Sequence, residues 1–316
     1  MSQRIVTIFG AAGFLGRHIV RALAKDGWRI RACSRTPQLA EFLRPYGMVG
    51  QIQPFKADIT NENEVRRAVL GADAVINLAG IMHGGFGGKR FTAVHDQGAA
   101  TVARLCAEAG VPRLVHVSAL GAHDDSEAKY AKSKLAGERA VREAFPGVTI
   151  LRPSVVFGQE DQFFNRFANM ARYTLVMPLI GGGETKFQPV FVADIAEAVK
   201  QVLARAETAG ETYELGGPEV MSFRQVIELI LKVIGRRRLM APVPFALAKL
   251  GSYPASLLPS PPLTPDQVEM LKGDSIVGEG AKGFAELGIS PEAPEAIVPG
   301  YLWRFRRTGQ FEPAAQ

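Results

Sequence analysis

Two residues in the middle of the sequence have the types and the spacing for proton transfer. Tyr130 and Lys134 stand four residues apart in a segment of helical character, so their side chains share one helix face. A tyrosine is too weak an acid to exchange protons readily near neutral pH, but a neighbouring ammonium favours its phenolate and can also hold a nicotinamide ribose. The pair is a candidate for carbonyl–alcohol redox chemistry. The same spacing also occurs on many solvated helices.

Three glycines near the N-terminus could form the phosphate-binding turn of a dinucleotide site. Gly10, Gly13 and Gly16 follow a short apolar run at 5–9 and precede a helical pattern at 17–25. Glycines let a strand turn sharply into a helix and let the backbone approach a pyrophosphate, while the helix N-terminus faces its negative charge. This arrangement predicts dinucleotide binding, with a tight turn that binds nothing as the alternative.

The end of the second predicted strand, at 28–35, bears on which dinucleotide is bound. An acidic residue there usually meets the ribose hydroxyls of NAD(H), whereas a 2′-phosphate requires cations. This chain places Ser34 and Arg35 there and no acid, with Arg17 as a second candidate cation. We therefore predict NADP(H), although Arg35 could also be a solvated charge at a strand end.

Two further strand ends are candidates for cofactor contact. A third predicted strand ends at Asp58 and Ile59, where an adenine ring would lie, and Asn61 with Glu64 predicts a capping box for the next helix. A fourth strand ends in small residues, Ala79 and Gly80, which permit close approach to a ribose or to nicotinamide.

The segments that follow continue the pattern of alternating elements. A glycine-rich stretch at 83–90 lacks the spacing of a phosphate loop and is predicted to be a connector. A helix is expected over 95–109, and a fifth buried strand over 113–120 contains Ser118.

This alternation of strands and helices predicts an α/β fold with a doubly wound parallel Rossmann sheet. We expect an NADP-binding domain over 1–158, with its sheet completed by 187–217. A smaller α/β lobe over 159–239 is interleaved with it, and a proline-rich docking extension covers 240–316.

The second half of the chain is less regular. Phe163, Phe164 and Phe167 have the spacing of a helix face and are predicted to be core. A strand is expected over 187–191, and Asp194 is expected to be the N-cap of the helix that follows it.

Prolines interrupt apolar segments from residue 240 onward, and Thr264–Pro265–Asp266 predicts the start of a short helix. Such segments can line a protein interface or lie at a lipid surface, or they can simply pack on the preceding lobe.

Composition excludes several classes of function. The 316 residues are 47% apolar and carry a net charge of +6, so a sizeable core and anionic partners are expected. Basic residues are scattered apart from Arg236–Arg238, so we expect no nucleic acid. Cys33 and Cys106 offer no disulfide framework or metal-ligand spacing, so we expect a reducing compartment and no metal. We also expect no spanning helix and no targeting peptide.

Together these motifs resemble those of atypical extended short-chain dehydrogenases/reductases. The resemblance covers about three quarters of the chain and rests on the following segments: GAAGFLG, the Tyr130–Lys134 pair, 151–158, 187–199 and 213–230. With the tail at 301–311, the segments are most similar to the accessory subunits of respiratory complex I of the alphaproteobacterial type.

The resemblance implies a peripheral subunit that binds NADPH without turnover of its own. It implies complex I subunits as partners, with membrane contact through 240–316 as a further option, on the cytoplasmic face of a bacterial inner membrane or the matrix side in mitochondria. The implied cofactor-binding residues, on the motifs above, are Gly10, Gly13, Phe14, Leu15, Gly16, Arg17, Ser34, Arg35, Asp58, Ile59, Ala79, Gly80, Ser118, Tyr130, Lys134 and Pro153.

Two departures from the family pattern concern catalysis. Ser118 lies unusually close in sequence to Tyr130, and His95, Asp96 and Gln97 stand where the family has a helix asparagine. Three hypotheses follow: a complex I accessory subunit, a free NADP-dependent reductase or epimerase that uses Tyr130 and Lys134, and a redox-sensing regulator.

Overall fold

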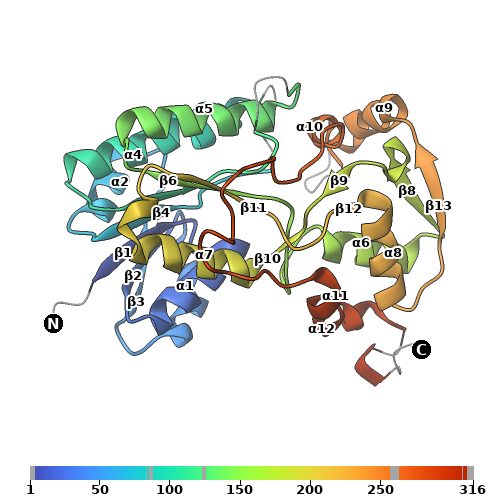
Figure 1. Ribbon diagram of the computed structural model, residues 1–316, viewed down its shortest axis with the longest axis horizontal. Coiled ribbons are helices and arrows are strands. Elements are labelled where there is room, and N and C mark those ends of the chain that lie inside the picture. Colours follow the sequence, from blue (N-terminus) through green and yellow to red (C-terminus); the bar gives the residue numbers. More distant parts are fainter. Residues whose placement is uncertain are drawn as a thin grey trace.

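The computed structural model describes residues 4–82, 84, 88–122, 126–256, 263–307 and 309–311. Half of the connector predicted at 83–90, residues 83 and 85–87, lies outside the described residues. Figure 1 shows a larger lobe built around a central sheet and a smaller lobe beside it.

The central sheet has seven strands, all parallel, in the order β11-β6-β5-β4-β1-β2-β3. This order reverses direction between β1 and β4, as in a doubly wound fold, so the predicted fold class is confirmed. Its strands are β1 (Ile5–Phe9), β2 (Arg29–Ser34), β3 (Ile52–Lys56), β4 (Ala74–Asn77), β5 (Leu114–Val117), β6 (Thr149–Pro153) and β11 (Thr212–Leu215).

Helices cover both faces of this sheet (Figure 1). One face carries α1 (Phe14–Lys25) and α7 (Val192–Ala204), which pack on each other. The other carries α2 (Glu62–Val69), α4 (Ala99–Glu108) and α5 (Lys129–Ala144). A 3-10 segment at Pro37–Tyr46 connects β2 to β3, and α3 (Lys89–Phe91) leads into a π-helical segment at Thr92–Gly98.

The smaller lobe is built from short strand pairs and helices around an aromatic core. Phe163, Phe164 and Phe167 join Phe223 in this core, which confirms the prediction for the three phenylalanines. The strands of this lobe and its junction are β7 (Val156–Phe157), β8 (Val176–Ile180), β9 (Lys186–Phe187), β10 (Val190–Phe191), β12 (Met221–Ser222) and β13 (Leu239–Val243). The helices are α6 (Phe164–Tyr173), α8 (Phe223–Val233), α9 (Phe245–Ala255), α10 (Pro265–Met270), α11 (Pro294–Ile297) and α12 (Pro299–Leu302).

After α10 the chain returns to the larger lobe and crosses its sheet edge (Figure 1, red-orange). The backbone N–H of Glu214 in β11 donates to the carbonyl of Lys282 at 2.8 Å. Phe284 and Leu287 are buried in the core cluster that contains β1 and α7. The segment around Lys282–Leu287 is therefore part of the larger lobe, whereas Tyr301 and Leu302 further along the chain lie in the core of the smaller lobe.

Several predicted boundaries differ from the structure. Helix α1 begins at Phe14 rather than at residue 17, because Gly13 already serves as its N-cap. Strand β3 ends at Lys56, so Asp58 and Ile59 lie in the loop after it. The helix expected from His95 begins earlier, since Lys89–Phe91 and the π-helical segment precede α4.

Two predicted helix caps are also wrong in detail. Asp194 lies inside the first turn of α7, and its carboxylate accepts the N–H of Glu292 at 2.8 Å instead of capping the helix. Asn61 does cap α2, but the Glu64 carboxylate accepts the N–H of Asp58 at 2.9 Å, so the reciprocal half of the box is absent. By contrast, Thr264 and Gln267 form a complete capping box at α10.

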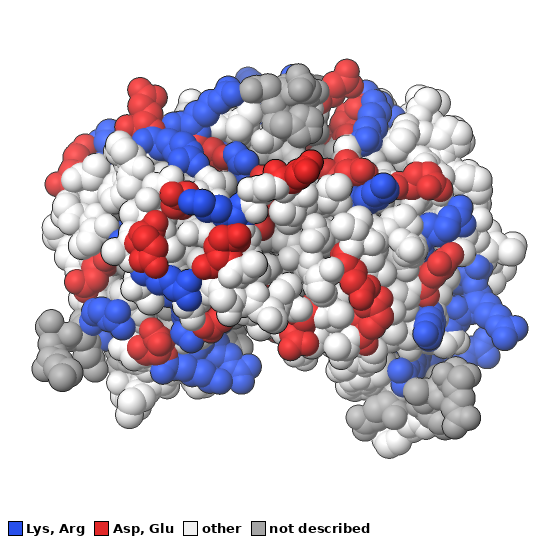
Figure 2. Space-filling view, in the orientation of Figure 1, with Lys and Arg blue, Asp and Glu red and all other residues white. Residues whose placement is uncertain are grey.

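Charges of both signs are mixed over the face shown in Figure 2, with a denser group of basic side chains at its right-hand edge, on the side of the smaller lobe. None of the helices in the described part of the chain combines the length and the apolar character needed to cross a bilayer.

Candidate functional site

The glycine turn after β1 requires glycine for steric reasons. Gly10 has φ of +81°, and a Cβ there would lie 3.2 Å from the carbonyl of Leu78 at the end of β4. A Cβ on Gly16 would come within 2.3 Å of the Gly10 oxygen. The turn therefore lies tightly between the ends of β1 and β4, at the point where the strand order reverses, and this is where doubly wound sheets bind their ligands.

The residues after β4 connect this turn with the Tyr130–Lys134 helix. The Ala79 N–H donates to the Asn77 side chain at 3.1 Å, which fixes the start of the loop. A Cβ on Gly80 would lie 3.5 Å from Lys134 Nζ and 3.5 Å from His95 Nε2. The structure thus brings together Gly80, Lys134 and His95, three residues from distant parts of the sequence.

Lys134 is held under the ends of the strands, where it is almost completely buried. Its ammonium donates to the carbonyl of Val117, the last residue of β5, at 3.1 Å. Burial lowers the pKa of Lys134 to about 8, against the opposing effect of the Glu138 carboxylate one turn later on α5. Glu138 is itself fixed by an ion pair with Arg152 of β6, at 2.6 Å.

Tyr130 lies on the same helix, as predicted, with its ring edge-on to Phe91 and His95. Lys134 Nζ is 6.0 Å from the centre of the tyrosine ring. Burial raises the pKa of Tyr130 to about 12. The expectation that the ammonium would favour the phenolate is therefore not met, because desolvation of the hydroxyl dominates.

His95 connects several parts of the site. Its Nε2 accepts the N–H of Ile81 at 2.9 Å, and its Nδ1 bonds the Ser133 hydroxyl at 2.9 Å. The Ser133 hydroxyl donates in turn to the backbone carbonyl of Tyr130 at 2.7 Å. Burial, reinforced by the charge of Lys134, lowers the pKa of His95 to about 3. A neutral imidazole thus joins the loop after β4 to the first turn of α5.

Two buried polar atoms near the strand ends have no hydrogen-bond partner within the described residues: Ser118 Oγ and His116 Nε2. Ser118 follows β5. Its backbone N–H donates to the Leu151 carbonyl at 2.8 Å, whereas its side-chain hydroxyl has no partner among the described residues. Pro153 ends the neighbouring strand β6, and its carbonyl accepts the N–H of Leu120 at 2.9 Å. Buried polar atoms are normally satisfied, so an unpaired hydroxyl here fits a site that takes a polar ligand.

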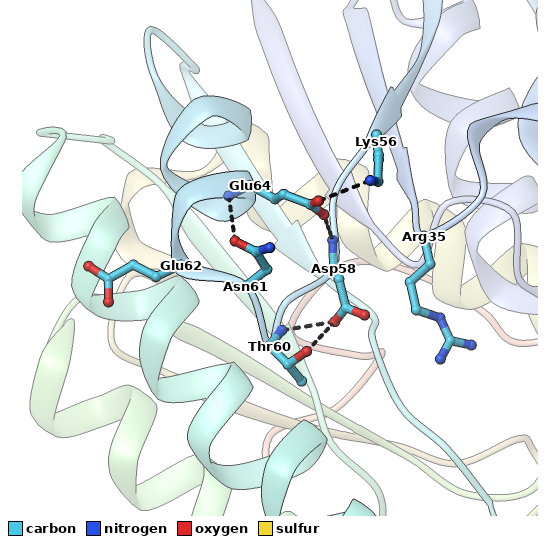
Figure 3. Close-up of a pocket in the computed structure, with 7 residues that line it drawn as sticks. All are labelled: Arg35, Lys56, Asp58, Thr60, Asn61, Glu62 and Glu64. Carbon is cyan, nitrogen blue, oxygen red and sulfur yellow. Dashed lines mark hydrogen bonds and ion pairs between the residues drawn. The ribbon is translucent and has the colours of Figure 1, made fainter.

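A cavity of about 550 Å³ lies beyond the ends of β2 and β3 (Figure 3). It is lined by Arg35, Lys56, Asp58, Thr60, Asn61, Glu62 and Glu64. Figure 3 shows the Arg35 guanidinium extending on the same side as the Asp58 carboxylate, whereas Lys56 turns toward Glu64, 3.3 Å away. Arg35 is thus the cation of this cavity that is not held by one of its acids in Figure 3.

Other predicted cofactor residues are engaged within the protein. The Ser34 hydroxyl forms hydrogen bonds with the backbone of Thr36. Arg17 stacks on Phe42, 4.9 Å from the ring centre, and its Nη1 lies 3.5 Å from a Glu160 oxygen.

The remaining predicted residues take different places. Arg17 Nε is buried without a hydrogen-bond partner among the described residues. Phe14 packs edge-on to His18, and Leu15 packs against the core. Asp58 accepts from Thr60 at 2.7 Å, and Ile59 is buried in the second core cluster of the larger lobe.

The structure therefore places Arg35, the glycine turn, Gly80 and Lys134 along the carboxyl ends of the neighbouring strands β2, β1, β4 and β5. The tight glycine turn, where added Cβ atoms would clash, and the unpaired Ser118 hydroxyl fit a dinucleotide. Sequence reasoning missed His116 and the Glu138–Arg152 pair, which no local motif marks. Within the described residues, no group of three or more metal-binding side chains is arranged to hold a metal ion.

Comparison with known proteins places the chain among nucleotide-binding proteins. Residues 6–216 match the NAD dependent epimerase/dehydratase family. The chain is 33% identical to the mitochondrial NADH dehydrogenase [ubiquinone] 1 alpha subcomplex subunit 9 of Arabidopsis thaliana, covering 98% of this chain and 80% of that protein. It is 31% identical to the mitochondrial NADH-ubiquinone oxidoreductase 40 kDa subunit of Neurospora crassa, covering 97% and 80%.

A ceramide reductase of Caulobacter vibrioides is 36% identical over a shorter stretch, 57% of this chain and 55% of that protein. Among solved structures, the NADPH-dependent quinone oxidoreductase of Escherichia coli complexed with NADPH has a TM-score of 0.74 at 22% identity, covering 94% of this chain and 99% of that one.

Proposed function

Because this chain belongs to the NAD dependent epimerase/dehydratase family, and within it is an extended short-chain dehydrogenase/reductase similar to complex I subunits, we propose that it is an NADPH-binding accessory subunit of a respiratory complex I. The observation that carries the proposal is identity of 31% and 33% to such subunits from a fungus and a plant, over nearly the whole chain. A match of this extent includes the smaller lobe and the C-terminal region, beyond the nucleotide-binding half that many enzymes share.

NADPH is the proposed cofactor because of the chemistry at the end of β2. Arg35 lines the cavity beyond this strand, and no acidic residue follows the strand directly. A guanidinium binds a 2′-phosphate well, whereas a cofactor with free ribose hydroxyls is usually met by a carboxylate at this position. The Asp58 carboxylate lines the same cavity and is available to bind the adenosine half of the cofactor.

A binding role without turnover is supported by the state of Tyr130. Its pKa is raised to about 12 by burial, which makes proton exchange near neutral pH slow. His95, one of the three residues that stand where the family has an asparagine, uses both ring nitrogens in hydrogen bonds to Ile81 and Ser133. These residues hold the helix and the loop together, which suits a site that retains its ligand.

The proposed docking surface lies in residues 240–316. On α9 the side chains of Leu247, Leu250 and Tyr253 are 60%, 69% and 56% exposed, at helical spacing. Apolar exposure of this kind on one helix is typical of a surface covered by another protein. We propose that it docks on another complex I subunit, which places the protein peripherally on the cytoplasmic face of a bacterial inner membrane, or on the matrix side in a mitochondrion.

The test is gentle purification from membranes of the source organism with a mild detergent. The expected result is co-fractionation with NADH:quinone oxidoreductase activity and NADPH in a one-to-one ratio to the chain. Recovery only as a monomer without nucleotide and without other complex I subunits contradicts the proposal. A Leu250→Glu variant should bind NADPH normally but leave the complex, while a Lys232→Glu variant, altered at an exposed position of α8, should remain in it.

A second candidate is a free NADP-dependent reductase or epimerase, and two observations favour it. Tyr130 and Lys134 keep the family spacing on α5, and a ceramide reductase is among the relatives. A bound nicotinamide would supply or accept hydride, and Tyr130 would transfer the proton. Steady NADPH oxidation with a carbonyl compound, lost in Tyr130→Phe, would support this candidate. A broad panel of carbonyl compounds, none of which supports NADPH oxidation, would exclude this candidate.

A further inference from the structure

The first turn of α5 is capped by a residue from the far end of the chain. Asp266 of α10 accepts the backbone N–H of Lys129 at 2.6 Å through Oδ1 and that of Tyr130 at 3.1 Å through Oδ2. The local N-cap residue, Ala128, provides no side-chain hydrogen bond. A carboxylate 136 residues away therefore does what a local serine or aspartate usually does.

This contact acts directly on the residues of the candidate site. The first N–H groups of a helix have no partner within the helix, and its N-terminus carries partial positive charge, so a carboxylate there fixes the turn. One of the two bonded amides belongs to Tyr130 itself, and Lys134 follows one turn later. Movement of Asp266 would therefore loosen the backbone of the turn that carries Tyr130 and leads to Lys134.

Helix α10 is attached both to the smaller lobe and to the segment before α5. Val268 is fully buried against the α9 region, and the Glu269 carboxylate pairs with Lys249 of α9 and with Lys272. Lys272 also lies 3.7 Å from Glu127, just before α5. The position of α10 thus connects α9, whose apolar side chains are exposed, with the start of the helix that carries Tyr130.

We propose that α10 controls how tightly the nicotinamide half of the cofactor is held, with Asp266 as the positioning residue. When α10 is docked, Asp266 orders the first turn of α5 and so keeps Tyr130 in place beside His95. When α10 moves away, that turn frays and the cofactor is held less tightly. The inference rests on the proposed NADPH binding, and linkage requires the converse, that NADPH binding strengthens the docking of α10.

The test compares Asp266→Ala and Asp266→Asn with Asp274→Ala in the full-length chain, by NADPH fluorescence titration. Asp274 is a matched control, since it also bonds a distant backbone amide, that of Lys186 at 2.8 Å, but away from α5. Asp266→Ala should raise the Kd for NADPH about fivefold, as expected for one lost N-cap. Asp266→Asn keeps one acceptor oxygen, so its increase should be about twofold. Asp274→Ala should leave the Kd unchanged.

Hydrogen exchange on the wild-type chain is a second test, and its result does not depend on whether a variant folds. NADPH should slow exchange at the amides of Lys129 and Tyr130 and at those of residues 266–270 in α10. Normal NADPH binding with no slowing in α10, or an unchanged Kd in Asp266→Ala, overturns this inference alone. A wild-type chain that binds no NADPH overturns the proposed function and this inference with it.

Discussion

The imidazole Nε2 of His95 accepts a hydrogen bond from the backbone N–H of Ile81, at 2.9 Å. An acceptor nitrogen carries no proton, so the proton of the neutral ring is on Nδ1, which bonds Ser133. Protonation of Nε2 would place two donors against each other inside the protein. The loop after β4 and the helix of Tyr130 are therefore joined only while His95 is neutral.

Acid should weaken the fold through this residue. The pKa of His95 is lowered from 6.5 to about 3, so between these values the unfolded chain binds a proton that the folded chain does not. The contribution of neutral His95 to the free energy of unfolding should be complete above pH 6.5. It should fall as the pH drops toward 3, by about 1.4 kcal/mol per pH unit for one proton. Urea unfolding at several pH values should show a shallower decline for His95→Asn. Burial also lowers the pKa of His116 to about 3, so this second histidine contributes to the slope that remains in the variant. If the free energy of unfolding fell equally steeply with pH in the wild type and in His95→Asn, this role of His95 would be excluded.

The buried ammonium of Lys134 predicts a pH dependence of the same sign at alkaline pH. Burial lowers its pKa from 10.5 to about 8, so the unfolded chain binds more protons between these values. The contribution of Lys134 to stability should therefore rise as pH increases from 8 to 10.5. Lys134→Met should be more stable than wild type at pH 7.5 and should lack this rise, while binding NADPH more weakly. Lys132→Met, on the exposed side of α5, should keep the wild-type profile, measured by denaturant unfolding at each pH.

Arg35 should discriminate between the two nicotinamide dinucleotides. A charge-assisted bond to a phosphate contributes about 1.5–3 kcal/mol, so Arg35→Asp should weaken NADPH binding at least about tenfold. NADH binding should change little, because NADH lacks the 2′-phosphate. Arg29→Asp, at the opposite end of the same strand, is the control and should affect neither. Equal weakening of both cofactors, measured by calorimetry, would show that Arg35 does not bind the phosphate.

Gly16 should tolerate no side chain. A Cβ there would come within 2.3 Å of the Gly10 oxygen and 2.6 Å of the Ala11 oxygen, both rigid backbone atoms. Gly16→Ala should destabilise the fold by about 2 kcal/mol or more and abolish nucleotide binding. Gly300→Ala is a suitable control, since no atom lies within 4 Å of its added Cβ. A Gly16→Ala protein with the wild-type melting temperature would contradict this account of the turn.

The parts of the site that follow from neighbouring residues could be predicted from the sequence. The strand at Ile5–Phe9, the glycine turn and the pair on α5 all depend on local spacing and side-chain size. The end of β3 was predicted two to three residues too late, because the apolar pattern continues through Ile59 although the strand pairing stops at Lys56.

The rest depends on contacts between segments that are far apart in the sequence. Asp194 was predicted to cap its own helix, but its oxygen accepts the N–H of Glu292, 98 residues away. Asp266 was expected only to favour its own helix, and its bonds to Lys129 and Tyr130 cross between the lobes. Hydrogen bonds that distant backbone amides donate to a carboxylate leave no local pattern in the sequence, so no spacing rule could have found them.

The return of the chain across β11 has a consequence for the order in which the protein is made. The sheet edge at Glu214 is completed by Lys282, and the core beneath it by Phe284 and Leu287. A nascent chain that has emerged only through β11 therefore has an edge strand that still lacks its partner segment and part of the core beneath it. That edge stays open to aggregation until residues 282–287 have emerged as well. The sheet of the larger lobe is thus completed only after the segments of the smaller lobe between 216 and 281 have been made.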